Sequence, residues 1–342
     1  MKFLPYLARR AAFFLPQVLG VVTITFIIVR LIPGDPARLM AGPLVPEAGL
    51  ELIRQKLGLV GPLPVQYINY LRNLTQGELG VSWYTGNPVA TDLVTRLPAT
   101  MELLLLTLLV TLAVMLPIAI RSVSLGKGWG KAVTRRGLFG YGMAAGAFPD
   151  FWLALIMVLI FYVVLGWLPA PTGQLDIGVP IPTRITGMYI VDSLLTGNWV
   201  VFKSSILHAI LPVFVLAFVY GGAIIKVAIV QGNQLQKAAF VNFAKVCGLS
   251  GATIDRYITR ATYPSVATAT AVTFGFLIGG AVLVETIFSW GGMGQYAVQS
   301  VINADFAAIQ GVVLVSALIN LVVYVLVDLV YFWVDPRIKS LG

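Results

Sequence analysis

Residues 307–333 read AAIQGVVLVSALINLVVYVLVDLVYFW, an apolar run that contains a single charged residue, Asp328. A helix needs about 20 apolar residues to cross a hydrocarbon core of about 30 Å, so this run predicts a membrane-spanning helix. Runs of similar length and composition precede it, at 10–32, 100–120, 138–165, 206–231 and 264–288. We therefore expect an all-α fold, a polytopic membrane helical bundle with six transmembrane helices.

The composition supports this class. The chain of 342 residues is 58% hydrophobic and 11% charged, with a mean hydropathy of +0.89. A soluble domain carries roughly twice that charged fraction, and an outer-membrane barrel shows short alternating strands instead. The net charge is +9, but the basic residues cluster beside the apolar runs, as insertion orientation requires, which argues against nucleic-acid binding. The single cysteine, Cys247, excludes an internal disulfide.

The basic residues also predict an orientation, because cytoplasmic loops carry an excess of Lys and Arg. The connections at 121–137 and 237–263 and the C-terminus are basic, whereas the connections at 166–205 and 289–306 hold few cations or none. We expect both termini in the cytoplasm. Lys2, Arg9 and Arg10 precede the first apolar run, and no small-residue cleavage site follows it, which predicts a retained first helix.

The segment 33–97 departs from a simple bundle, because it is long, mixed in charge and rich in Pro and Gly. Two short helices are predicted within it, over 46–57, with Gly58 as its stop, and over 65–74. We expect this segment to be ordered and to lie on the outward, periplasmic side. The chain then divides into 1–99, the first helix plus this segment, and a core domain over 100–342.

A polar, helix-poor segment is predicted at 237–263, between two apolar runs. Residues 242–247 can form one or two helical turns that end at Gly248 in a C′ position. Its apolar side chains are Phe243, Val246 and Leu249, with basic residues on both sides. Such a helix can insert into a cleft of a partner protein, or it can lie on anionic lipid.

The chain lacks a nucleotide site of its own. The run 126–131 superficially resembles a phosphate-binding loop, but its spacing is wrong and Ala132 stands where the Mg²⁺-binding hydroxyl is needed. A separate motor protein that docks on 237–263 would explain both the missing nucleotide site and the short helix predicted in this segment. The only histidine, His208, excludes a His-based metal cluster, and we expect it near a helix start with a polar partner.

Acidic residues inside apolar runs are costly and are candidates for function. Each of these acids could line a pathway. For Glu102 and Asp150, near span edges, we favour pairing between helices or a side chain that reaches toward the membrane surface, and Asp328 lies near the inward end of the last span. Glu285 lies near the outward end of the fifth span, before a Gly-rich loop that can move. Glu285, Gly292 and Gly294 are therefore pathway or gate candidates, the alternative being that Glu285 is an anchor at the membrane surface.

Several short motifs follow one another in a specific order. They are Pro33-Gly34-Asp35-Pro36, Leu57-Gly58-Leu59, Gly80-Val81-Ser82, Arg96-Leu97-Pro98-Ala99-Thr100, Phe151-Trp152-Leu153 after Pro149, Leu165-Gly166-Trp167-Leu168-Pro169, His208 with Pro212, and Asp335-Pro336-Arg337-Ile338. With these motifs the chain resembles the inner-membrane permease subunits of bacterial ABC importers. The resemblance is to the dipeptide/oligopeptide/nickel family, on its first-permease (B-type) side.

The resemblance implies a type I ABC importer permease, which is not an enzyme and has no catalytic or metal-binding residues. It implies a heterodimer with a second permease in the lipid of the bacterial cytoplasmic membrane, and a periplasmic solute-binding protein. It also implies two ATPase subunits, which bind ATP and Mg²⁺, so that this chain holds no cofactor. Short peptides are the implied substrates, with nickel chelates, oligosaccharides or opine-like solutes as alternatives.

The resemblance also implies an ATPase-docking site. Its residues would be Asn242, Phe243, Ala244, Lys245, Val246, Gly248 and Leu249. The chain departs from the family in beginning this site with Asn-Phe-Ala rather than Glu-Ala-Ala or Arg-Thr-Ala. Two rival functions have weaker support. An intramembrane enzyme would need paired catalytic groups, for which only Asp150 and Asp328 are available. A secondary transporter predicts inverted repeats, which the sequence lacks.

Overall fold

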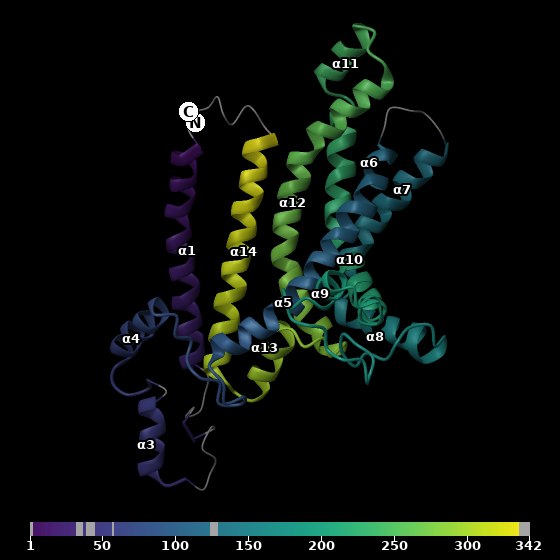
Figure 1. Ribbon diagram of the computed structural model, residues 1–342. Helices are drawn as coiled ribbons and strands as arrows, with labels where there is room; N and C mark the ends of the chain where they lie inside the picture. Colours follow the sequence, from purple (N-terminus) through teal and green to yellow (C-terminus); the bar gives the residue numbers. More distant parts are fainter. Residues whose placement is uncertain (1–2, 32–36, 39–44, 57, 124–128, 335–342) are drawn as a thin grey trace.

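The computed structural model describes residues 3–31, 37–38, 45–56, 58–123 and 129–334 (Figure 1). The motifs at 33–36 and 335–338 and the residues 126–128 lie outside the described residues, as does Leu57. Within the described ranges the regular structure is helical, apart from one isolated β-bridge between Val81 and Pro88. The all-α class is therefore confirmed.

Among the described residues, four helical segments are long and apolar enough to cross a membrane. The first joins α5 (Val89–Val110), a π-helical turn (Thr111–Met115) and α6 (Leu116–Ser122). The others are α10 (Trp199–Leu235), α12 (Gly251–Ile287) and α14 (Phe306–Val334). α1 (Phe3–Leu31) contributes a shorter apolar helix over Phe14–Ile28. The chain is a multi-pass membrane protein.

The third predicted span, 138–165, is bent rather than straight. α7 (Trp129–Ala144) and a 3₁₀ turn (Ala145–Ala147) meet α8 (Asp150–Val158) and its π-helical extension (Leu159–Val164) at an angle of 102°. The bend lies at Phe148 and Pro149, both of which have extended backbone conformations. Proline disfavours a helical conformation in the residue before it, which explains the break. Counted with this bent pair, the spans number up to five.

α10 is the central helix of the bundle and packs against α5, α7, α8 and α12. Fully buried Leu103, Leu216 and Leu277 form the middle of the core with Phe274, which is also buried. Glycines let the helices approach closely: a Cβ at Gly222 would lie 2.5 Å from Ala145 Cβ, and one at Gly142 would lie 2.9 Å from the Gly222 carbonyl oxygen. The packed core therefore depends on small residues, as is common between membrane helices.

The two ends of the bundle carry different elements (Figure 1). One end, called the α11 end here, has α11 (Ala239–Val246), the facing ends of α6 and α7, and the first residues of α1. The opposite end, called the α3 end, has α3 (Glu47–Lys56), α4 (Leu63–Thr75) and α13 (Met293–Ile302). α14 packs beside α1 and ends near the start of that helix.

The two short helices predicted in the segment 33–97 are confirmed as α3 and α4. Gly58 ends the first in a left-handed conformation with φ of +63°. α4 is attached to α1, because the Tyr67 and Thr23 hydroxyls lie 2.5 Å apart and Arg30 Nε donates to Gln66 Oε1. Residues 89–97, which we assigned to this segment, belong instead to the long helix α5.

An irregular segment, 165–188, folds back across the α3 end. The Gly173 N–H donates to the Phe288 carbonyl, and the Asp176 N–H donates to Ser204 Oγ. His208 is buried in the interior of α10 rather than at a helix start, which corrects our expectation. The polar partner that we expected is present: Nδ1 lies 2.9 Å from the Ser204 carbonyl oxygen, and Nε2 lies 3.8 Å from Asp176 Oδ1.

Asp192, in α9 (Tyr189–Thr196), binds the last residues of the segment 165–188. Its carboxylate accepts hydrogen bonds from the Ile185, Thr186 and Gly187 backbone N–H groups and from the Thr186 hydroxyl. Burial raises the pKa of Asp192, but these hydrogen bonds outweigh it and hold the pKa below its ordinary value. The closed segment is therefore held by an ionised carboxylate at neutral pH.

Candidate functional site

The segment 237–263 is largely helical, which corrects the expectation of a helix-poor loop. α11 occupies Ala239–Val246, and α12 begins at Gly251, well before the apolar run that we predicted at 264–288. Ser250 caps α12, because its Oγ accepts a hydrogen bond from the Thr253 N–H. The first turns of α12 are amphipathic and bury Ile254 and Ile258. This burial stabilises a helical conformation in a stretch that we expected to be a loop.

α11 is held against α12 by its inner face. Val241 and Ala244 are buried with Ile254 and Ile258, and Leu235 packs against them. Ala244, one of the seven predicted docking residues, therefore supports the helix and does not offer its side chain to a partner. The turn after α11 has the predicted C′ glycine: Gly248 has φ of +74°, and the Leu249 N–H donates to the Ala244 carbonyl.

α11 projects from one end of the bundle (Figure 1), and its outer face carries exposed apolar side chains. Phe243 is 71% exposed and Val246 is 87% exposed, and Asn242, Lys245, Gly248 and Leu249 are exposed beside them. Phe240 extends the same face one turn earlier, and our sequence analysis missed it although its spacing from Phe243 and Val246 is helical. This exposed face, Phe240, Phe243 and Val246, is called the α11 face below.

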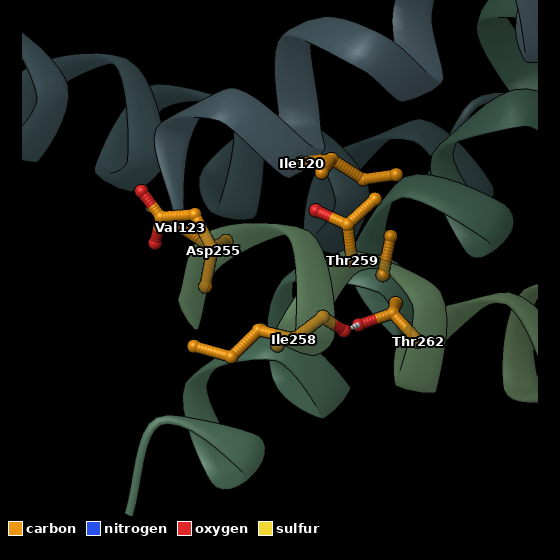
Figure 2. Close-up of a pocket in the computed structure, with 8 residues that line it drawn as sticks. Ile120, Val123, Asp255, Ile258, Thr259 and Thr262 are labelled. Atoms are coloured by element: carbon orange, nitrogen blue, oxygen red, sulfur yellow. Dashed lines mark hydrogen bonds between the residues drawn. The ribbon is translucent and has the colours of Figure 1, made fainter. Parts of the chain in front are cut away.

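A small cavity lies where α6, α10 and α12 meet below α11 (Figure 2). Its lining includes Ile120 of α6 and Val123 just after it, Gly232 of α10, and Ile258 and Thr262 of α12, and its volume is about 20 Å³. That volume holds about one water molecule, which is too small for a solute. The cavity is therefore a packing gap between α6, α10 and α12, and it is not a substrate site.

A second cluster surrounds Glu285, near the α3 end of α12. Glu285 is fully buried, and its Oε2 accepts hydrogen bonds from the Gly294 N–H (2.8 Å) and the Gln295 N–H (3.1 Å). These donors belong to the first turn of α13, where a carboxylate is favoured by the helix dipole. Thr100 of α5 completes the cluster, since its hydroxyl accepts a hydrogen bond from the Met293 N–H.

Two of the glycines after α12, Gly292 and Gly294, are packed, whereas Gly291 has open space around it, which corrects part of our expectation of a mobile loop. Gly292 precedes α13, and Gly294 lies inside that helix. A Cβ at Gly292 would fall 2.5 Å from Glu285 Oε2, and one at Gly294 would fall 2.6 Å from Val282 Cα. The structure thus brings the three gate candidates, Glu285, Gly292 and Gly294, into one contact that joins α12 to α13.

Sequence reasoning missed the partners of this cluster. Thr100 comes from α5, and Trp290, between α12 and α13, donates from its indole N–H to the Ala99 carbonyl. These contacts join residues nearly two hundred positions apart, which no local pattern predicts. The only sequence signal was that Ala99 and Thr100 belong to one of the ordered motifs.

The other acids have the helix-to-helix partners that we expected. Glu102 is buried and accepts hydrogen bonds from the Tyr189 and Ile190 N–H groups at the start of α9. Asp150 Oδ2 accepts a hydrogen bond from the Tyr220 hydroxyl of α10. Neither contact is a salt bridge, and the Asp328 side chain lies outside the described residues.

Comparison with known proteins gives matches over nearly the whole chain. The family described as binding-protein-dependent transport system inner membrane component matches residues 122–340, and the model of that component's N-terminal region matches residues 3–104. A protein of Escherichia coli K12 named as a probable D,D-dipeptide transport system permease is 39% identical over 100% of this chain and 99% of its own length. A di/tripeptide transport system permease of Pseudomonas aeruginosa is 35% identical over 98% of this chain and 99% of its own length. A dipeptide transport system permease of Alkalihalophilus pseudofirmus is 32% identical over the same shares.

Proposed function

Since the chain belongs to the family of binding-protein-dependent transport system inner membrane components, and is thus a permease subunit of an ABC importer and not an enzyme, we propose that it carries short peptides. One observation carries the substrate class: three relatives that align over 99% of their own lengths are named for dipeptides, di/tripeptides or D,D-dipeptides. Nickel chelates, oligosaccharides and opine-like solutes are the alternatives.

The substrate class can be tested in cells. A strain lacking this chain is compared with its parent for uptake of labelled L,L-dipeptides, D,D-dipeptides, tripeptides, a nickel chelate and an oligosaccharide. We expect loss of uptake for at least one short peptide and unchanged uptake of the nickel chelate and the sugar. Loss of nickel or sugar uptake alone would replace the peptide assignment by one of the alternatives.

The assembly that we propose has this chain and a second permease as a heterodimer around the pathway. Two ATPase subunits, which bind ATP and Mg²⁺, dock at the α11 end, and a solute-binding protein delivers substrate at the α3 end. α1 supplies the sixth span beside α14, and both termini are cytoplasmic in the bacterial inner membrane. The basic connections at the α11 end support this orientation, since positive residues stay in the cytoplasm.

Labelling of single cysteines checks this orientation. In a Cys247→Ser background, a cysteine at Glu51 or Gln76, both exposed, should react with an impermeant maleimide in intact cells or spheroplasts. The parent chain is the matched control, because its only cysteine, exposed Cys247, should react after the membrane is opened. The reverse pattern of labelling would invert the topology.

The docking proposal rests on the exposed α11 face and on the glycine turn that ends α11. Gly248 occupies a left-handed conformation with open space around it, so a β-branched residue there is strained by of order 1–3 kcal/mol without a clash. We expect Gly248→Val to leave the chain in the membrane and to uncouple ATP hydrolysis from uptake.

Gly251→Val is the matched control for this variant. Gly251 also has open space around it, but it lies in the first turn of α12, outside the left-handed region. We expect near-normal coupling in the control. Normal uptake and stimulated ATPase activity in Gly248→Val, together with no cross-link from Cys247 to an ATPase subunit, would contradict the docking site.

A further inference from the structure

α4 lies against the outward end of α1, on the side of α1 that faces away from α14 (Figure 1). The Tyr67 hydroxyl lies 2.5 Å from the Thr23 hydroxyl, and the rings of Tyr67 and Tyr70 pack on Phe26 with centroid separations of 5.2 Å and 5.6 Å. Thr23 and Phe26 belong to the apolar part of α1, Phe14–Ile28. These contacts place α4 at the outward surface of the membrane, and the placement rests on the proposed function of α1 as the sixth span.

α4 crosses α1 and does not run along it. Gln66 and Tyr67 are neighbours in α4, yet Gln66 Oε1 accepts a hydrogen bond from Arg30 Nε while Tyr67 meets Thr23. Thr23 and Arg30 are two helical turns apart in α1, a separation of about 10 Å along the helix. Gln66 therefore marks the side of α4 that faces outward to water, and Tyr67 marks the side that faces the middle of the membrane.

The side of α4 that faces the middle of the membrane is apolar. Successive residues of a helix are about 100° apart, so Ile68 lies one step beyond Tyr67, on the side away from Gln66. Ile68 is 62% exposed. Two further residues project to the same side by helical spacing, exposed Pro64 and partly buried Leu71. These three residues, Pro64, Ile68 and Leu71, are called the apolar side of α4 below.

The opposite side of α4 is polar. Asn69 and Asn73 are exposed one turn apart, and by helical spacing both lie near Gln66. These two residues are called the amide side of α4. The helix is thus amphipathic in the direction that the contacts with α1 define: the apolar side faces the membrane and the amide side faces water.

Charges and rings around α4 suit the headgroup layer of a membrane. α4 contains no acidic residue, and its one cation, Arg72, is exposed. Arg30, at the end of α1, lies over the Phe26 ring at 4.7 Å, and within the described ranges no acid forms a salt bridge with it. Unpaired cations attract anionic lipid headgroups, and tyrosines such as Tyr70 are enriched at this level of a membrane.

We infer that α4 binds the outer leaflet of the membrane, with its apolar side among the acyl chains and its amide side in water. Such a helix lies in the plane of the interface and does not span the membrane. A binding protein approaches from the water and meets the amide side, so the apolar side is left to lipid. α1 continues this lipid surface, because Ile24, Ile27 and Ile28 are exposed at the same depth. The bound helix holds the segment that carries α3 at a fixed height above the membrane.

The test measures the depth of two neighbouring residues in the complete complex, reconstituted in liposomes that contain phosphatidylglycerol. In a Cys247→Ser background, Ile68→Cys or Asn69→Cys is labelled with an environment-sensitive fluorophore. Iodide quenches the fluorophore from the water, and lipids brominated near the top of the acyl chain quench it from the membrane. We expect brominated lipid to quench the probe at Ile68 several-fold more than the probe at Asn69, and iodide to show the reverse order. Asn69 is the matched control, because it is also exposed and lies on the opposite side of the same turn.

Two results would overturn the inference. Equal quenching by iodide at both positions would place α4 in water, and shielding of Ile68 from both quenchers would assign the apolar side to the second permease or the binding protein. A third probe, at Leu19→Cys, checks the premise, because Leu19 is 47% exposed within the apolar part of α1. Ready quenching of that probe by iodide would contradict the sixth span itself, so the two failures are distinguishable.

Discussion

Replacing Phe243 with aspartate should reduce ATP-driven uptake by about a hundredfold or more while the chain still folds and inserts. Phe243 is 71% exposed in this chain, and no core contact is lost when it changes. A buried aromatic side chain at the centre of an interface contributes about 2 kcal/mol or more, and a carboxylate forced into an apolar cleft adds a further penalty. At about 1.4 kcal/mol for each factor of ten, these losses give the expected reduction.

The measurement is the amount of ATPase subunit that co-purifies with the tagged permease, together with uptake. Leu52→Asp is the matched control, because Leu52 is 62% exposed on α3 and the same change of charge is made at the opposite end of the bundle. We expect the control to retain the ATPases and Phe243→Asp to lose them. Full co-purification with the Phe243→Asp chain would show that the α11 face meets lipid or solvent instead.

Replacing Glu285 with leucine is expected to cause the second large effect. The change leaves the Gly294 and Gln295 N–H groups buried without an acceptor, and each unsatisfied donor costs about 1–3 kcal/mol. The contact between α12 and α13 should open, and we expect uptake to fall by more than tenfold at matched amounts of complex. Glu285→Gln keeps one oxygen for these donors but loses the charge beside the start of α13, so a smaller, several-fold loss is expected.

Uptake is measured for both variants after the amounts of assembled complex are matched. Thr286→Val is the control, because among the described residues the Thr286 hydroxyl bonds to the Val282 carbonyl of its own helix alone. We expect the control to transport normally, Glu285→Gln to be impaired and Glu285→Leu to be worse. Normal rates in both Glu285 variants would end the gate proposal.

The sequence predicted those elements whose signal is local. Apolar length predicted the long helices, and acidic and glycine signals predicted α3 together with its end at Gly58. Gly248 was likewise predicted as the residue that ends α11. In each case a few neighbouring residues determine the backbone conformation, so no tertiary contact is needed to predict it.

Two local signals were present and were misinterpreted. Pro149 disfavours a helical conformation at Phe148, and this rule predicts the bend in the third span. Ile254 and Ile258 have helical spacing with Thr262, and this pattern extends α12 through a stretch that we took for a loop because of its charge. The polar composition of 251–263 led us to overlook an amphipathic helix, because its apolar face is narrow.

The candidate sites depend on contacts that local patterns do not contain. Glu285 was a candidate because it is an acid within a span, but its partners come from α5 and α13. Ala244 belongs to the motif of the docking segment, yet it is buried, because burial depends on how α11 packs against α12. Tertiary packing thus decides which residues of a motif face a partner and which support the fold.

The central claim is that this chain forms the membrane pathway of an ATP-driven peptide importer, and reconstitution tests it most directly. The chain is purified with its second permease and ATPases and placed in proteoliposomes with ATP inside and loaded binding protein outside. We predict accumulation of labelled dipeptide that requires ATP, the binding protein and catalytically active ATPases, and that the Phe243→Asp chain fails to support. Peptide uptake that is equal with and without ATP, or that a proton or sodium gradient drives alone, would contradict the account.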